Sequence, residues 1–315
     1  MTAPTDVREL GHDRHLIDLR FRGTPGLIGS YLLPLPEGWA MVETGPTRCR
    51  DALLHGLAAA GVDRSEVRQV FVTHIHLDHA GGVGAVQHDL PRATFYAHAH
   101  GVPHLIAPAK LDASARRAWG PVFDEILGGL VPVDPTRIRP LTGGERFPLR
   151  DGELRVLDTP GHARHHLSFF DTATRAMLTG DSAGVRVPGS DRARPAVPPP
   201  DLDLEILDAS VRKMIEEGPE SLWYTHFGPY PGGRTPLEEY RRSVREWAEV
   251  ARAALEERAD VSFVAERLRE FELRRIGPGG ESTVAREDLV SGTEMAAMGL
   301  VRYLTGRPSA GAVAP

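Results

Sequence analysis

The segment THIHLDHAGG, residues 73–82, constrains the fold most, because it holds three histidines and one aspartate within six positions. A β-branched apolar run precedes it and predicts a strand. Side chains two positions apart on a strand face the same side, so His74 and His76 can point at one site. We expect a helix to begin near Asp78, which would let Asp78 and His79 reach a second site close by. This spacing favours a pair of metal ions, and its imidazole and carboxylate groups suit Zn, Fe or Mn.

Three further donors occur later in the chain, each after an apolar run that predicts a strand. They are His162 in DTPGHARHH, Asp181 in MLTGDSAG and His226 in LWYTHFGPY. A ligand on a loop at a strand end is held in place by the rigid sheet behind it. The sequence therefore predicts one metal centre that is assembled from several strand ends.

Short strands and helices alternate along the first part of the chain, which predicts an α/β architecture. Apolar runs separated by glycine and proline predict strands at residues 15–21, 27–33, 38–44 and 93–98. Good helix formers predict a helix that ends at Gly61, and we expect residues 103–130 to be helical as well. Strands return from residue 137, and the run SLWYTH is expected to form the last strand.

The composition changes after Gly233, and this change predicts a second unit. Apolar side chains between Leu237 and Ala254 recur at three- and four-residue spacing, which is the pattern of one helical face. We therefore expect a catalytic domain at residues 1–234, followed at 235–315 by a helical extension whose last eight residues form a frayed tail. The apolar faces of the extension are expected to pack against a second copy in a homodimer.

Charge and cysteine content restrict the partners and the compartment. The net charge of −6 over 315 residues argues against a nucleic-acid partner, which usually meets a basic surface. Cys49 is the single cysteine, so no intramolecular disulfide can form and no oxidising compartment is implied. The N-terminus lacks the pattern of a signal peptide, and no run of about 18 apolar residues predicts a membrane span. We expect a cytoplasmic protein without a membrane partner.

The order His-x-His-x-Asp-His, then His, Asp and His, resembles the metallo-β-lactamase superfamily over roughly residues 15–230. The resemblance implies a four-layer αββα sandwich with the metal site at one edge of its two sheets. It also implies how the seven ligands divide: His74, His76 and His162 hold one metal, Asp78, His79 and His226 hold the other, and Asp181 bridges them. Glu43 stands where the family usually has aspartate, and we expect it to support the site structurally.

Two positions indicate the subfamily. His76 occupies the position where the flavodiiron oxidoreductases of this superfamily carry glutamate, which favours a hydrolase. The bridging Asp181 and the helical extension resemble glyoxalase II-like enzymes, and the wording of residues 73–82 is similar to a prokaryotic subgroup of the superfamily.

The resemblance implies a function. Two divalent metal ions, zinc first and iron or manganese as alternatives, would generate a bridging hydroxide that cleaves a small thioester, ester or lactone. Asp78 would act as the catalytic proton handler in addition to being a ligand. His165 and Tyr230 are our candidates for contacts with a small-molecule substrate.

Three alternatives stay open. The same ligand set permits a mononuclear iron persulfide dioxygenase, and the superfamily also contains nucleases. A non-catalytic metal-binding protein of the same fold is the third alternative, because a fold alone does not establish activity.

Overall fold

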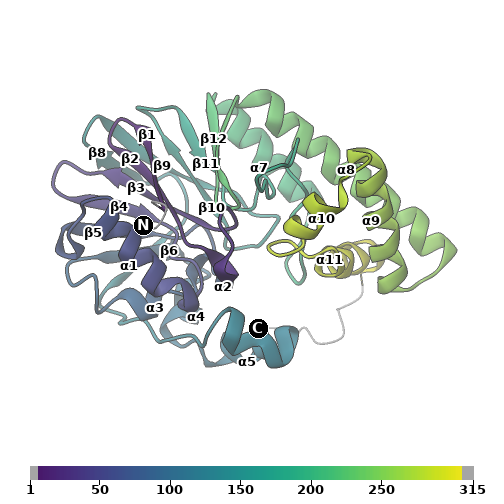
Figure 1. The fold of residues 1–315 in the computed structure, drawn as a ribbon, viewed down its shortest axis with the longest axis horizontal. Helices are drawn as coiled ribbons and strands as arrows, with labels where there is room; N and C mark the ends of the chain where they lie inside the picture. Colours follow the sequence, from purple (N-terminus) through teal and green to yellow (C-terminus); the bar gives the residue numbers. More distant parts are fainter. Residues whose placement is uncertain (1–5, 307–315) are drawn as a thin grey trace.

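Two β-sheets face each other in the computed structural model, which describes residues 6–306 (Figure 1). The first sheet follows the chain order, with antiparallel pairing from β1 to β4 and parallel pairing from β4 to β7. Its strands are β1 (Val7–Gly11), β2 (Arg14–Asp18), β3 (Gly29–Pro34), β4 (Trp39–Val42), β5 (Val67–Phe71), β6 (Thr94–His98) and β7 (Ile138–Leu141).

The second sheet has the order β13-β12-β11-β10-β9-β8. Its pairs are antiparallel except for β11 and β12, which run parallel. The strands are β8 (Arg146–Leu149), β9 (Gly152–Asp158), β10 (Leu167–Asp171), β11 (Ala176–Leu178), β12 (Ser221–Tyr224) and β13 (Gly228–Pro231).

Helices connect the parallel strands, because a parallel pair needs a crossover rather than a tight turn. In the first sheet these are α1 (Arg50–Ala59), α2 (Leu77–Ala80), α3 (Val83–Val86), α4 (Val102–Ile106), α5 (Ala109–Trp119) and α6 (Phe123–Ile126), and in the second sheet α7 (Leu204–Glu216). The chain then continues through α8 (Arg234–Glu257), α9 (Val261–Ile276), α10 (Glu281–Glu287) and α11 (Thr293–Thr305).

Three apolar clusters hold the layers together. Between the sheets, Phe71 lies 5.5 Å from Phe169 and Tyr31 stacks on Trp223 at 5.2 Å, measured between ring centroids. A second cluster packs α1 and its neighbours on the outer face of the first sheet, and a third packs α7 and α8 on the second sheet. The expected four-layer αββα sandwich is therefore confirmed.

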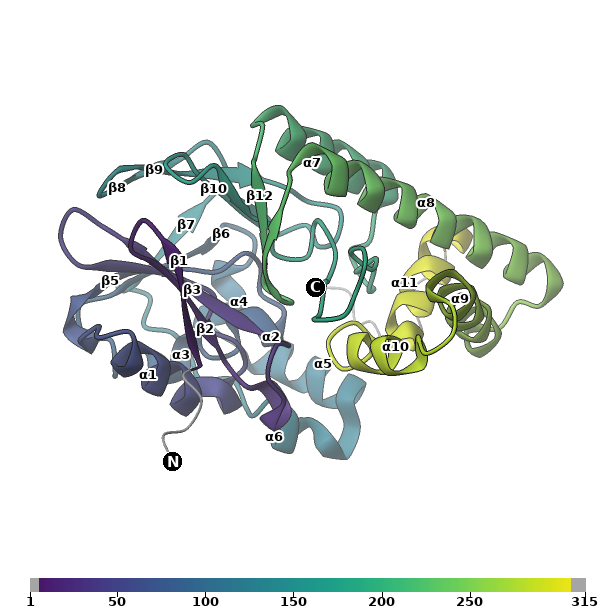
Figure 2. The same cartoon turned by 45° about the horizontal axis from the view of Figure 1, so that its top comes forward.

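The C-terminal helices gather at one end of the sandwich (Figure 2). The apolar stripe of α8 lies in the same cluster as Leu222 of β12, and Trp247 at its centre is fully buried. This stripe is therefore covered within the chain itself and is not free to pack on a second copy. The homodimer and the domain boundary at residues 234 and 235 stay predictions.

Some predicted elements differ from the observed ones. The helix expected at 103–130 is divided into α4, α5 and α6, because Pro108 precedes α5 and Gly120 ends it with a φ of 62°. A further strand, β13, follows the one expected to be last, and it carries prolines as an edge strand can.

Within residues 6–306, no helix has both the length and the apolar character needed to cross a bilayer. The tail expected at residues 308–315 lies outside the described residues.

Candidate metal centre

The histidine-rich segment lies in the turn between β5 and α2. The strand ends at Phe71, the next residues cross the edge of the sheet, and the helix begins at Leu77 with His76 at its N-cap. His162 follows β9, Asp181 follows β11 and His226 follows β12. All seven predicted ligands therefore follow strand ends along one shared edge of the two facing sheets.

Three ring nitrogens converge in the first group of donors. His76 Nδ1 lies 2.9 Å from His74 Nε2 and 3.0 Å from His162 Nε2. These three atoms meet the geometric requirement for a common metal ion. The grouping agrees with the assignment that the family resemblance implies.

The second group combines two imidazoles and a carboxylate. His79 Nε2 lies 3.1 Å from His226 Nε2, and Asp78 Oδ2 lies 3.4 Å from His226 Nε2. These donors also lie close enough together to share an ion.

Asp181 lies between the two groups. Its Oδ1 is 3.4 Å from His79 Nε2 and 3.6 Å from His226 Nε2, whereas its Oδ2 is 3.6 Å from His162 Nε2. Each oxygen therefore faces a different group of histidines, which is the arrangement that a bridging ligand needs. Oδ1 is buried and accepts no hydrogen bond among the described residues. A buried carboxylate oxygen without a partner is costly unless a cation lies beside it.

The outward nitrogens of the histidines fix how the rings are protonated. His226 Nδ1 lies 2.8 Å from the carbonyl oxygen of Leu27, and His162 Nδ1 lies 2.9 Å from that of Ala196. A carbonyl can only accept, so each Nδ1 must carry a proton, and in the neutral ring the lone pair then lies on Nε2. This orientation is the one in which histidine binds metals.

Glu43 is a buried carboxylate that contacts a histidine of the site on the side away from the cavity. It is fully buried, and its Oε1 lies 3.1 Å from His79 Nδ1 and accepts hydrogen bonds from the hydroxyl groups of Thr73 and Thr225. The Thr73 hydroxyl also lies 3.0 Å from His74 Nδ1. One carboxylate thus contacts predicted ligands of both groups, directly at His79 and through Thr73 at His74, as a supporting residue would.

Electrostatics favour a cation at this edge. Burial lowers the pKa of His74 well below its usual value and that of His76 to about 3, so both rings are neutral and can donate lone pairs. Burial alone would lower the pKa of His79 as well, but the carboxylates of Asp181 and Asp78 outweigh it and raise that pKa well above its usual value. The donor types, their lone pairs and the excess of carboxylate charge all fit a divalent metal ion.

His166 is a supporting residue that the sequence did not reveal. Its Nε2 accepts a hydrogen bond from the backbone N–H of Asp181 at 3.0 Å, while its Nδ1 lies 2.9 Å from the Thr159 hydroxyl. Gly180 allows this close approach, since a Cβ there would lie 2.6 Å from His166 Nε2. The repeated histidines in HARHH were the available signal for such a role.

A cavity of about 730 Å³ opens over the centre. Four of the predicted ligands reach it: His76, Asp78, His162 and Asp181. Its walls come from α5, from the proline-rich segment 196–200 and from the segment that joins α10 to α11. The C-terminal helices therefore complete the space in which a substrate would lie.

The two predicted substrate contacts lie elsewhere. His165 is buried beside His76, with ring centroids 5.9 Å apart, and Tyr230 lies on β13 under the guanidinium of Arg186 at 3.3 Å. Neither is among the residues that line the cavity, so their contact with substrate stays a prediction.

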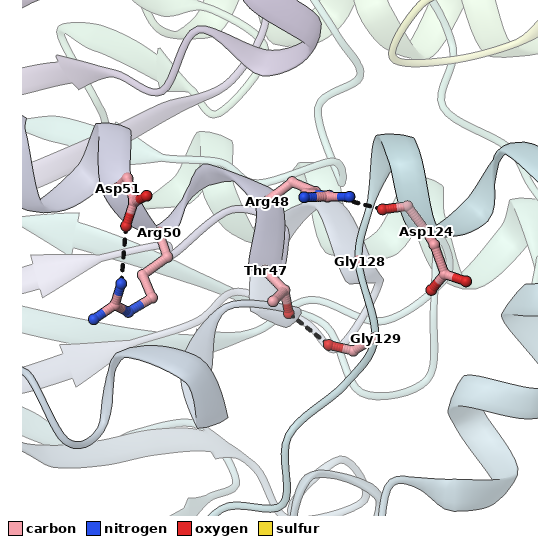
Figure 3. A pocket seen from close by; sticks show the side chains of 7 residues that line it. All are labelled: Thr47, Arg48, Arg50, Asp51, Asp124, Gly128 and Gly129. Carbon is pink, nitrogen blue, oxygen red and sulfur yellow. Dashed lines mark hydrogen bonds and ion pairs between the residues drawn. The ribbon is translucent and has the colours of Figure 1, made fainter.

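A second hollow of about 400 Å³ lies beside the start of α1 (Figure 3). Its arginines already have partners, because Arg48 donates to the carbonyl oxygen of Asp124 and Arg50 pairs with Asp51. None of the predicted metal ligands lines this hollow, and we do not assign the chemistry to it.

We expect Glu43→Gln to weaken metal binding by about tenfold to a hundredfold, the usual effect of altering a group that orients a metal ligand. The variant keeps the size of the side chain and removes its charge. Competition with a chromophoric chelator measures the affinity, and Glu37→Gln, which alters an exposed glutamate, is the matched control. Equal affinities for Glu43→Gln and the unaltered protein would contradict the supporting role.

Comparisons with known proteins agree with this geometry. The chain is 29% identical over 165 residues to the metallo-beta-lactamase fold-containing protein ST1585 of Sulfurisphaera tokodaii, a match that covers 50% of this chain and 60% of that protein. It is 26% identical over 248 residues to the atrochrysone carboxyl ACP thioesterase of Aspergillus fumigatus, with 78% and 60% covered. The matches thus span about 60% of the length of these curated relatives.

The fold likeness extends further along the chain. The crystal structure of the metallo-beta-lactamase family protein TTHA1429 from Thermus thermophilus matches with a TM-score of 0.64 at 22% identity, and covers 88% of this chain and 89% of that one. The model of one family, described as the metallo-beta-lactamase superfamily, matches residues 23–260. Because that match includes most of the sandwich and all seven predicted ligands, the chain belongs to the metallo-beta-lactamase superfamily.

Proposed function

We propose that the protein is a dinuclear metal-dependent hydrolase of a small thioester, ester or lactone, with zinc as the first candidate metal and iron or manganese as alternatives. The position of Asp181 carries the proposal, because its two oxygens face two separate groups of donors. A purely structural metal site is usually closed by four protein ligands. Here His76, Asp78 and His162 also line an open cavity, which leaves room for a substrate.

A bound pair of divalent ions would act as a Lewis acid and would lower the pKa of a metal-bound water to about 7, so that hydroxide is available near neutral pH. The residues of this chain add proton handling. Oδ2 of Asp78 is the oxygen that approaches His226 and His79, at 3.4 and 3.8 Å, which leaves Oδ1 to accept a proton from the attacking water. The carbonyl oxygens of Leu27 and Ala196 hold the rings of His226 and His162 in place during this step.

The similarity to a thioesterase over 248 residues supports an acyl-transfer reaction to water. A mononuclear iron persulfide dioxygenase is the alternative that the same ligand set permits. A nuclease and a non-catalytic metal-binding protein are further outcomes that the test below separates.

Elemental analysis of protein purified without added metal tests the proposal. We expect about two zinc ions per chain, together with turnover of a panel of esters, thioesters and lactones that stops when a chelator removes the metal. About one iron per chain, with oxygen consumption on glutathione persulfide, would instead establish the dioxygenase. Full metal occupancy without turnover of any substrate in the panel would favour a binding protein.

We infer a small-molecule substrate and no nucleic-acid or membrane partner, in line with the net charge of −6. A shift of labelled RNA or DNA that weakens with salt would contradict this and favour the nuclease. Light scattering measures the mass in solution and therefore tests the proposed homodimer. The apolar stripe of α8, one of the faces expected to form the dimer contact, is covered within the chain.

A further inference from the structure

Three segments that are distant in sequence give the cavity over the metal centre an apolar wall. Leu111 and Ala115 line it from α5, and Met295 and Met298 line it from α11 on the other side. The run Pro198–Pro200 completes the wall. An apolar wall of this kind binds an apolar group, because each methylene removed from water contributes to binding.

Arg117 stands apart in this lining. It is exposed in the last turn of α5, and Trp119, which ends this helix and is 37% exposed, also lines the cavity. The neighbouring Arg116 pairs with Asp112 and Asp124. Arg117 makes no ion pair or hydrogen bond with any residue of the described chain. It is therefore a cation at the mouth of the cavity that is free to meet an anion.

Apart from the predicted metal ligands, the cavity lining has two acidic residues, and neither forms an ion pair with Arg117. Asp288 is engaged by Arg194 at 2.7 Å and by Arg269 at 2.6 Å. Glu294 lies in the first turn of α11, where the helix dipole favours a negative charge.

We propose that the substrate is an acyl thioester or ester with an apolar acyl chain and an anionic leaving group. The acyl chain lies between α5 and α11, and the anionic group reaches Arg117 at the mouth, where it keeps most of its hydration. This assignment rests on the hydrolase function proposed above. In the reaction, the oxygen of water bonds to the acyl carbon and the carbon–sulfur or carbon–oxygen bond breaks. The two hydrogens of water end on the carboxylic acid and on the released thiol or alcohol.

Two series of thioesters test the proposal. N-acetylcysteamine thioesters with acetyl, butanoyl, hexanoyl and octanoyl groups have a neutral leaving group. We expect kcat/KM in this series to rise roughly fourfold for each added methylene until the cavity is full. Met298→Trp places a larger side chain in the wall and narrows the cavity. We therefore expect this variant to prefer a shorter acyl chain than the unaltered protein does.

Coenzyme A and glutathione thioesters of the same acyl groups test whether the protein prefers an anionic leaving group. The negative charge lies on phosphates in coenzyme A and on carboxylates in glutathione. We expect Arg117→Glu to lower kcat/KM for the preferred anionic series by about fivefold to tenfold and to leave the neutral series unchanged. The binding constant of the free anionic thiol, measured by calorimetry, should weaken by the same factor. Arg242→Glu, an exposed arginine of α8 that does not line the cavity, is the matched control.

The outcomes separate the two levels of the proposal. If metal-loaded protein hydrolyses no ester, thioester or lactone, the hydrolase function itself fails. If it hydrolyses lactones but no acyl ester or thioester, the hydrolase function stands and the acyl substrate is wrong. If it hydrolyses acetyl and octanoyl thioesters equally well, the apolar acyl site is wrong. If Arg117→Glu and Arg242→Glu behave alike on every series, the anion site at the mouth is wrong.

Discussion

Replacing His76 by alanine is expected to lower metal content below that of the unaltered protein and to reduce kcat/KM by roughly a thousandfold or more. The reason is that a lost ion removes several kcal/mol of transition-state stabilisation. His76 presents the nitrogen on which the first group converges, within 3.0 Å of both His74 and His162. The fold should survive, because the side chain lies at the cavity and not inside an apolar cluster.

Metal content per chain and turnover are measured on the same preparation, and circular dichroism checks the fold. His55→Ala removes an exposed histidine of α1 and should change none of these quantities. Unchanged metal content and activity in His76→Ala would refute the site.

Arg194→Met is expected to lower the free energy of unfolding by about 3–5 kcal/mol, the usual effect of removing one member of a buried ion pair. Arg194 is 1% exposed and donates to Asp288 at 2.7 Å and to the Thr293 hydroxyl at 2.6 Å, and it lies 3.5 Å from the buried Glu287. Methionine fills a similar volume but leaves the buried Glu287 without an ion-pair partner among residues 6–306 and leaves Asp288 with Arg269 alone. Urea denaturation of the metal-loaded protein measures the change.

An exposed pair provides the comparison for Arg194→Met. Arg234 and Glu238, one turn apart at the start of α8, have side chains that are 69% and 50% exposed. Arg234→Met should therefore change the free energy of unfolding by less than about 1 kcal/mol. Similar effects for the two variants would show that the buried network does not hold the C-terminal helices to the sandwich.

The Arg194 network also connects the C-terminal helices to the metal centre. Two residues further along the chain, the carbonyl oxygen of Ala196 accepts a hydrogen bond from His162 Nδ1. On the other side of this segment, Gly299 of α11 packs so closely that an added Cβ would lie 2.0 Å from the carbonyl oxygen of Val197. The helices therefore support a predicted ligand, His162, in addition to lining the cavity.

The sequence by itself predicted an α/β architecture and the convergence of the candidate ligands in one metal centre, and its resemblance to a known family implied the four-layer sandwich. His74, His76, Asp78 and His79 are neighbours in the chain, so the geometry of one strand end relates them to each other. His162, Asp181 and His226 each follow an apolar strand, and the ends of packed strands meet at a shared edge. Periodicity and turn residues carry this information locally, and alternation of strands and helices is enough to indicate the layers.

The tertiary structure alone decided which groups support the ligands and what surrounds them. His166 reaches the backbone of Asp181, and Glu43 meets Thr225, only because long-range packing places them there. The same holds for the cavity, whose walls on α5 and α11 are separated by most of the chain. Hydrogen bonds and apolar contacts between distant segments depend on the three-dimensional arrangement of whole layers, and a local pattern of residues does not encode that arrangement.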